Sequence, residues 1–200
     1  GSAIMVWADD RNIDSSDIDI YTQRIDTSCN TLWSLPEEGG IPLCSAQGNQ
    51  EYAKVTYYNE DVSVVVWEDR RFNSLYGDIF IQYINMSGEL QLDPEGEGIC
   101  THEAPQIKPR VKASPQGTYV VWEDTRNISS TGSDIYVQHH IFGQGSQYEQ
   151  DGLGVCLAPG SQDQPRLTAD GFGGAYIVWM DERYGDFPET EIFMQHLDVS

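Results

Sequence analysis

Four aspartates are crowded into ten positions near the start of the chain, at Asp10, Asp14, Asp17 and Asp19. Carboxylate oxygens are the ligands that Ca²⁺ prefers, so this segment makes calcium a candidate cofactor. The spacing does not match an EF-hand loop, and Arg11 would compete for the same carboxylates. The alternative is therefore that these acids pair with groups of the protein itself.

A second pattern, Trp-x-Asp-x-Arg, occurs four times, each time at the end of an apolar run. In a strand these three side chains share one face, where an Arg can bind a carboxylate through two hydrogen bonds. The acid that opens the next segment is the expected neighbour of this Arg. The pattern predicts a structural ladder of paired Asp and Arg side chains that is repeated in each unit. In the alternative interpretation, the same acids are ligands of a calcium ion. Its residues are Trp7, Asp9, Arg11, Trp67, Asp69, Arg71, Trp122, Asp124, Arg126, Trp179, Asp181 and Arg183.

Three basic residues, Lys54, Arg110 and Arg166, stand at one position of the same repeating unit. In an acidic protein they could converge to hold an anion, such as a sugar acid or a carboxylate of a partner. Alternatively, each neutralises an acid of its own or a neighbouring repeat. Both interpretations stay open at this point.

Six aromatic residues break the repeat and are expected in exposed loops. Because protein and carbohydrate contacts favour aromatic side chains, they are the predicted binding surface. They are Trp33, Tyr57, Tyr58, Phe72, Tyr76 and Phe187.

Nothing in the sequence identifies a reaction. There is no Gly-x-Ser-x-Gly and no Cys or His spacing typical of zinc, so no catalytic residue is predicted. Acids for glycoside hydrolysis are too abundant for any pair to be singled out. Cys44, Cys100 and Cys156 recur at one position of the unit, so we expect buried thiols there, and a free surface thiol at Cys29.

The elements that position these residues follow a period of 56, as the spacing of Cys44, Cys100 and Cys156 shows. Each unit is predicted to contain four short strands with turn residues between them. In the segment Ile135 to Val137, Ile135 and Val137 point to one face and Tyr136 to the other. A sheet that is apolar on both faces must be covered on both sides, which the stacked blades of a β-propeller achieve.

The sequence thus predicts an all-β fold, a β-propeller of about 3.5 four-stranded repeats. We expect one propeller domain over 3–200, either four-bladed or a segment of a larger propeller. Residues 1–2 are expected to be a cloning remnant. The repeat units are approximately 3–48, 49–104, 105–160 and 161–200.

The segments Val121 to Arg126 and Asp134 to Gln138 resemble the repeats of secreted and cell-surface bacterial or archaeal propellers, loosely those of the TolB type. The resemblance implies a protein-interaction, adhesion or carbohydrate-associated module and no catalytic residues. The unit is longer than that of TolB and carries the recurrent Cys, which argues against a TolB-like partner.

The net charge of the chain limits the classes of partner that it can bind. With 32 acidic against 11 basic residues the chain carries a formal charge of -21, which would repel a nucleic acid. No apolar run is long enough to cross a bilayer, so membrane insertion is not expected.

The first hypothesis is a non-catalytic, secreted or cell-surface propeller that binds protein or carbohydrate, with self-association or additional repeats open. A carbohydrate-active propeller enzyme of the glycoside hydrolase or sialidase kind is the alternative. A structural repeat of a larger surface protein is the third.

Overall fold

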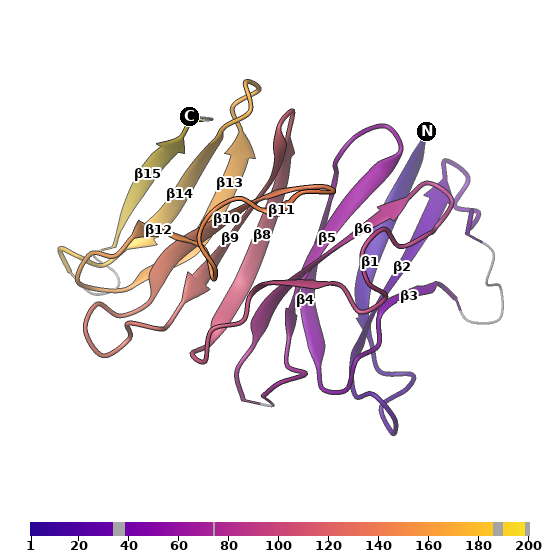
Figure 1. Cartoon of the computed structure of the whole chain (residues 1–200), viewed down its shortest axis with the longest axis horizontal. Coiled ribbons are helices and arrows are strands. Elements are labelled where there is room, and N and C mark those ends of the chain that lie inside the picture. The colour runs from indigo at the N-terminus through magenta and orange to yellow at the C-terminus, as the bar shows by residue number, and fades with distance from the viewer. Residues whose placement is uncertain (34–38, 74, 186–189, 199–200) are drawn as a thin grey trace. The chain divides into compact units, whose positions relative to one another are not determined.

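The computed structural model describes residues 1–33, 39–73, 75–185 and 190–198, and in these the regular structure consists of β-strands. The strands form four antiparallel sheets, one for each predicted repeat unit (Figure 1). We call them the first to fourth blades, in chain order. Their strands are β1 (Ser2–Asp9), β2 (Asp19–Asp26) and β3 (Ile41–Cys44); β4 (Gln50–Tyr57), β5 (Val62–Asp69), β6 (Asp78–Asn85) and β7 (Glu97–Cys100); β8 (Gln106–Ser114), β9 (Gly117–Asp124), β10 (Asp134–Ile141), β11 (Gly145–Ser146) and β12 (Leu153–Cys156); β13 (Gln162–Ala169), β14 (Ala175–Asp181) and β15 (Glu191–Leu197).

The blades repeat one register. In each blade the Trp-x-Asp-x-Arg strand pairs with the following strand, so that the motif Asp lies opposite the acid that opens that strand. The pairs are Asp9 with Asp19, Asp69 with Asp78, Asp124 with Asp134, and Asp181 with Glu191. The loop between these two strands is called the motif loop below (residues 10–18, 70–77, 125–133 and 182–190). The predicted repeat register is confirmed.

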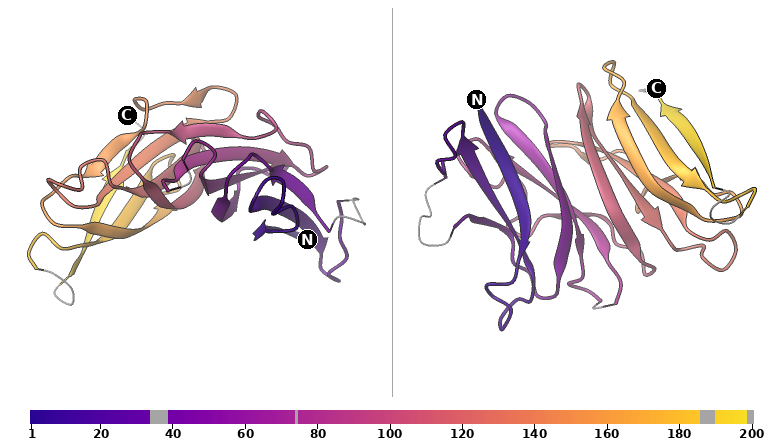
Figure 2. Two further views of the ribbon diagram at one scale, coloured as in Figure 1. Left: turned by 90° about the horizontal axis from the view of Figure 1, so that it is seen from below. Right: turned by 180° about the vertical axis from the view of Figure 1, so that it is seen from behind.

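The chain divides into two compact units, Gly1–Gly98 and Ile99–Ser200. In the first unit, Ile20 and Leu43 of the first blade share an apolar core with Val65 and Trp67 of the second. In the second unit, a matching core joins the third and fourth blades, whose strands lie side by side in both views of Figure 2; it includes Val121, Ile135, Ile177 and Trp179. Each core thus lies between two sheets.

The central strands are covered on both faces. Every residue of β5 and of β9 is buried, including neighbours that point to opposite sides of the sheet. Alternation along a strand means that such burial requires cover above and below. The prediction of an all-β propeller built from repeated blades is therefore confirmed, whereas the choice between a four-bladed propeller and a segment of a larger one stays a prediction. The prediction of one domain over 3–200 stays a prediction.

The first strand of three blades contains a β-bulge at the same place. The register shifts between Glu51 and Lys54, and the residue inside the bulge, Tyr52, has a φ of 58°. Lys108 and Gln164 occupy the equivalent places with φ values of 55° and 52°. The left-handed conformation costs a non-glycine residue about 1 to 2 kcal/mol, so the bulge must be held by other contacts.

Candidate functional site

The Trp-x-Asp-x-Arg residues form one compact cluster in each blade. In the second blade, Trp67 Nε1 donates to Asp69 Oδ2 at 2.8 Å, and Arg71 donates from Nε to Oδ1 at 2.9 Å and from Nη2 to Oδ2 at 2.6 Å. The Arg71 guanidinium lies 4.0 Å above the ring of Phe80. The same cluster recurs with Tyr21, Tyr136 and Phe193 as the ring. These contacts support a structural role.

One detail of the expected ladder differs. The Arg lies in the motif loop and binds the Asp two residues earlier, with its guanidinium over the aromatic ring of the next strand. The acid that opens that strand has other partners in the first blade: Asp19 Oδ2 accepts from Asn12 Nδ2 at 3.1 Å and from Ser16 Oγ at 2.9 Å.

The candidate calcium ligands are not brought together. Within the residues that the structure describes, no three His, Cys, Asp or Glu side chains gather where they could hold a metal ion. Asp19 is buried, whereas Asp10, Asp14 and Asp17 are exposed. Calcium binding by this loop stays a prediction, without support from the positions of its carboxylates.

The three basic residues of the first strands bind the backbone of the bulges. Lys54 Nζ donates to the carbonyl oxygens of Tyr52 at 3.1 Å and Ala53 at 3.0 Å. Arg110 Nη1 donates to Pro109 O and Arg166 Nη1 to Pro165 O, each at 2.9 Å. A bulge takes carbonyl groups out of the strand ladder, so a cation that binds them helps to hold the strained backbone. These contacts support a structural role, and anion binding stays a prediction.

Trp33 does not lie on the exposed surface predicted for it. Its side chain is 4 % exposed, and its Nε1 donates to Met86 O of the second blade at 3.0 Å. The ring packs so closely on Gly88 that a Cβ there would lie 3.1 Å from it. The sequence placed Trp33 correctly outside the repeat, but its ring fills a gap in the first unit.

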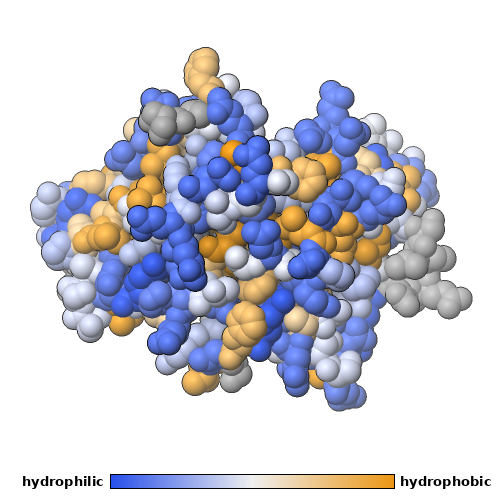
Figure 3. Space-filling model, in the orientation of Figure 1, coloured by the Kyte–Doolittle hydropathy of each residue, from blue (hydrophilic) through white to orange (hydrophobic). Residues whose placement is uncertain are grey.

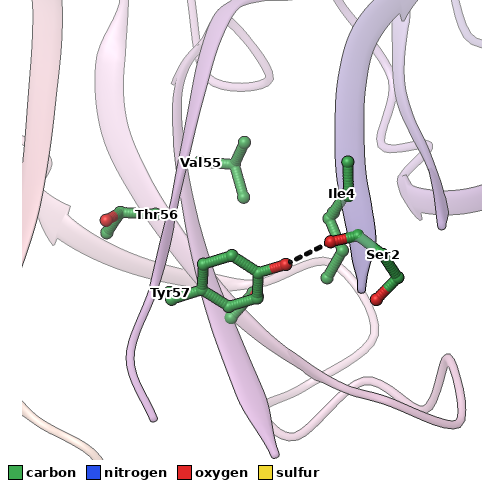
Figure 4. Close-up of a pocket in the computed structure, with 7 residues that line it drawn as sticks. Ser2, Ile4, Val55, Thr56 and Tyr57 are labelled. Atoms are coloured by element: carbon green, nitrogen blue, oxygen red, sulfur yellow. Dashed lines mark hydrogen bonds between the residues drawn. The ribbon is translucent and has the colours of Figure 1, made fainter. Parts of the chain in front are cut away.

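Tyr57 and Tyr58 stand at the end of β4 rather than in a separate loop. Tyr57 is exposed, and its hydroxyl donates to Ser2 O at 3.0 Å across a pocket of about 210 Å³ lined also by Ile4 and Val55 (Figure 4). Tyr58 is half-buried and meets the ring of Tyr83 edge-on at 5.4 Å. Neither is a free aromatic platform.

Exposed aromatic rings do occur in the motif loops. Phe72 is 71 % exposed and Tyr76 41 % exposed in the second blade, and Tyr184 is 72 % exposed in the fourth. Phe72 and Tyr184 each directly follow the motif Arg. Phe187, predicted in the same loop as Tyr184, lies outside the described residues.

The residue after the motif Arg alternates between blades. In the first and third blades it is Asn: Asn12 Nδ2 donates to the Tyr21 hydroxyl at 3.0 Å, and Asn127 Nδ2 donates to Asp134 Oδ2 at 3.0 Å. In the second and fourth blades it is Phe72 or Tyr184. Tyr184 was missed, although its position next to Arg183 was a signal visible in the sequence.

This alternation also changes the ring beneath. The blades with Asn carry Tyr in the next strand, and the blades with an exposed aromatic carry Phe there. The ring centres of Phe72 and Phe80 are 6.3 Å apart, and those of Tyr184 and Phe193 are 6.4 Å apart. Two blades thus bind the motif loop by polar contacts, and two by an aromatic pair with one exposed member.

Repeated antiparallel blades, with one Trp-Asp-Arg cluster in each, place the chain among the β-propeller proteins. No family model matches the chain, and no curated protein matches it. Among solved structures, it resembles an endo-arabinase from Bacteroides thetaiotaomicron with 10 % identity and a TM-score of 0.52, over 96 % of this chain and 69 % of that one.

Two further structures match less well. One is an α-L-arabinofuranosidase from Lactobacillus brevis, with 12 % identity and a TM-score of 0.49, over 98 % of this chain and 69 % of that one. The other is a BT0996 RGII complex, with 10 % identity and a TM-score of 0.48, over 90 % of this chain and 56 % of that one. The first likeness shows the fold alone, and these two add nothing to it.

Proposed function

We propose that the chain is a non-catalytic carbohydrate-binding propeller module that works outside the cell, secreted or at the cell surface. The observation that carries the proposal is the pair of equivalent aromatic rings, Phe72 and Tyr184, exposed at the same place in two blades. A side chain that repeats in every blade serves the unit, whereas a departure from the repeat can serve a ligand. Flat exposed rings offer the apolar faces on which sugar rings stack.

The base of each exposed ring is fixed. The backbone N–H of Arg71 donates to Asp69 Oδ1 at 3.0 Å, and that of Arg183 donates to Asp181 Oδ1 at 3.0 Å. The chain therefore enters the motif loop in a set direction just before Phe72 and Tyr184. A fixed backbone at this point reduces the conformational entropy that the loop loses on binding, which favours affinity for a ligand with few contacts.

The exposed loop rings suit a sugar better than a large protein partner. On the face shown in Figure 3, hydrophobic residues lie in patches among hydrophilic ones. Protein interfaces bury a larger continuous area around an apolar centre. Isolated aromatic rings among polar groups suit single sugar residues of a chain.

The composition supports a place outside the cell. A formal charge of -21 keeps a protein dispersed in a salty medium, where its self-repulsion is screened. No helix among the described residues is long and apolar enough to cross a membrane.

A glycan array tests the proposal with the whole chain. The wild type is expected to bind a defined set of glycans, and the double variant Phe72→Ala, Tyr184→Ala is expected to lose at least tenfold in affinity. The matched control is Leu75→Ala with Ile128→Ala, because both residues are exposed apolar side chains of motif loops without an aromatic ring.

Three outcomes contradict the proposal. The first is equal binding by the double variant and the control. The second is release of sugar from any bound glycan in a hydrolysis screen, which would make the chain an enzyme. The third is binding of a protein partner without any glycan, which would assign the rings to a protein surface instead.

A further inference from the structure

A pocket of about 270 Å³ lies in the second unit, away from the motif loops. Three of its lining residues carry rings: Tyr119 of β9, His139 of β10 and Tyr148, which follows β11. Gln116 and Gln147 contribute amide groups, and Asp198 contributes a carboxylate. The volume lies just below the roughly 300 to 1,000 Å³ of pockets for drug-sized ligands, so it suits one small ring.

The rings of the pocket are held before any ligand arrives. The imidazole of His139 stacks on Tyr119 with 4.4 Å between the ring centres and an angle of 9°, and Tyr148 lies tilted against its edge at 6.1 Å. Tyr148 lies close enough to Tyr119 to raise the pKa of its hydroxyl. The Tyr148 N–H donates to Gln138 Oε1 at 3.0 Å, which fixes the backbone below.

The charge of the pocket lining favours a ligand without an acidic group. Its lining holds the carboxylate of Asp198 and neither Lys nor Arg. Asp170 lies close enough to act on the Tyr119 hydroxyl: burial raises the pKa of Tyr119 to about 12, and Tyr148, Asp170 and Asp198 add to the rise. Burial also lowers the pKa of His139, which disfavours a positive charge on its imidazole.

We infer that this pocket binds a single sugar ring that carries no acidic group. Amide and carboxylate groups bind the hydroxyls of such a ligand through hydrogen bonds. The ring of Tyr148 packs on the apolar face of the sugar. The site is separate from the motif loops, so it goes beyond the proposed function and does not depend on Phe72 or Tyr184.

The fourth blade provides a matched control. Tyr176 and His196 are opposite partners on β14 and β15, as Tyr119 and His139 are on β9 and β10. They stack in the same way, with 4.4 Å between the ring centres and an angle of 22°. They do not line the pocket, so a change at Tyr176 tests whether loss of a tyrosine near a histidine is enough to alter binding.

The experiment titrates the whole chain with methyl glycosides of neutral hexoses and pentoses, each neutral sugar paired with its uronic acid, and follows amide signals by NMR. At least one neutral sugar is expected to saturate with a Kd on the order of 1 mM, with its uronic acid at least tenfold weaker. Tyr148→Ala should weaken binding at least tenfold, and Tyr176→Ala should leave it unchanged. If Tyr148→Ala does not fold, Gln147→Ala at the exposed rim replaces it.

Asp198→Asn tests the charge argument. Removal of this negative charge should reduce the difference in Kd between a neutral sugar and its uronic acid. The inference is overturned if no sugar binds, if acidic and neutral sugars bind equally, or if Tyr176→Ala weakens binding as much as the pocket variant. Shifts of the amide signals of Gln116, Tyr119, Tyr148 and Asp198 report on this pocket. Shifts confined to the motif loops report on the loops instead, so failure of this site and failure of the glycan-binding loops can be told apart.

Discussion

The thiol of Cys44 lies 3.2 Å from Nη2 of Arg71, although the two residues belong to neighbouring blades. Cys100 and Arg126 repeat this contact at 3.4 Å, and Cys156 and Arg183 at 2.9 Å. Each Trp-Asp-Arg cluster beyond the first is thus covered by the last strand of the preceding blade. The contact makes the cluster part of the packing between blades as well as of one hairpin.

The first prediction concerns the carboxylate at the centre of this cluster. The Asp69 side chain is fully buried and accepts hydrogen bonds from Trp67 and Arg71, so Asp69→Asn removes the carboxylate that a half-buried guanidinium binds. We expect a loss of about 3 to 5 kcal/mol in the free energy of unfolding, measured with urea. Asp9→Asn is the matched control: the side chains of Asp9 and Arg11 are 14 % and 33 % exposed, so water replaces part of the lost contact.

The loss for Asp9→Asn should be clearly smaller than the loss for Asp69→Asn. Similar losses in the two variants would show that the cover from the preceding blade contributes nothing.

Acid should weaken the same cluster in the fourth blade. Burial raises the pKa of Asp181, but hydrogen bonds from Arg183 and Trp179 outweigh it and bring the pKa to about 2, against an ordinary value of 3.8. The folded state then binds fewer protons than the unfolded state, so this carboxylate stabilises the fold above about pH 4. The stabilisation is lost as the pH falls towards 2.

Urea midpoints between pH 6 and pH 2 check this prediction. The difference between wild type and Asp181→Asn should be constant down to about pH 4 and then shrink. A difference that stays constant down to pH 2 would contradict the lowered pKa.

The blade architecture could be predicted because its determinants recur in the sequence. The Gln that ends each Ile-aromatic-x-Gln segment shows why: Gln82 Nε2 donates to Asp93 O at 2.7 Å, and its Oε1 accepts from the backbone N–H of Leu92 at 2.9 Å. Gln138 makes the same two kinds of contact with the loop at Glu149 and Tyr148. Gln23 joins strand to loop in the same way at Trp33, so the contact recurs in three blades and its spacing reveals the repeat.

The candidate sites were harder to predict, since they depend on local geometry that no spacing encodes. Nothing about Lys54 in the sequence indicates that Tyr52 adopts a left-handed conformation, which brings the Tyr52 carbonyl to the lysine. The burial of Trp33 depends on Met86, 53 residues later. The pocket at Tyr119 combines residues of the third blade with Asp198, and only the packing of two blades brings them together.

Thiol reactivity should distinguish one cysteine from the other three. All four are free; Cys29 is exposed, Cys44 and Cys100 are buried, and Cys156 is half-buried. Burial raises the pKa of Cys44, Cys100 and Cys156 above the ordinary value, which lowers their thiolate fraction. With a disulfide reagent at pH 8, one thiol per chain should react fast, and Cys29→Ser should abolish this fast phase. Two or more fast thiols in the native protein would be inconsistent with the burial of the repeat cysteines.

The last prediction concerns Gly152, which packs against a tryptophan ring of its own blade. Its φ is +86°, and a Cβ added there would lie 2.5 Å from the ring of Trp122 and 2.9 Å from Val137 O. Gly152→Ala therefore adds a steric clash to the cost of the left-handed backbone. Gly143, with a φ of +79° and no atom within 4 Å of an added Cβ, is the matched control.

Gly143→Ala should cost about 1 to 2 kcal/mol in the free energy of unfolding, which is the backbone cost alone. Gly152→Ala should cost at least about 2 kcal/mol more, because Trp122 is fully buried and cannot move aside without disturbing its bond to Asp124. The two urea unfolding curves, measured side by side, give the difference directly. Equal costs would mean that the tryptophan ring does not rest on this glycine.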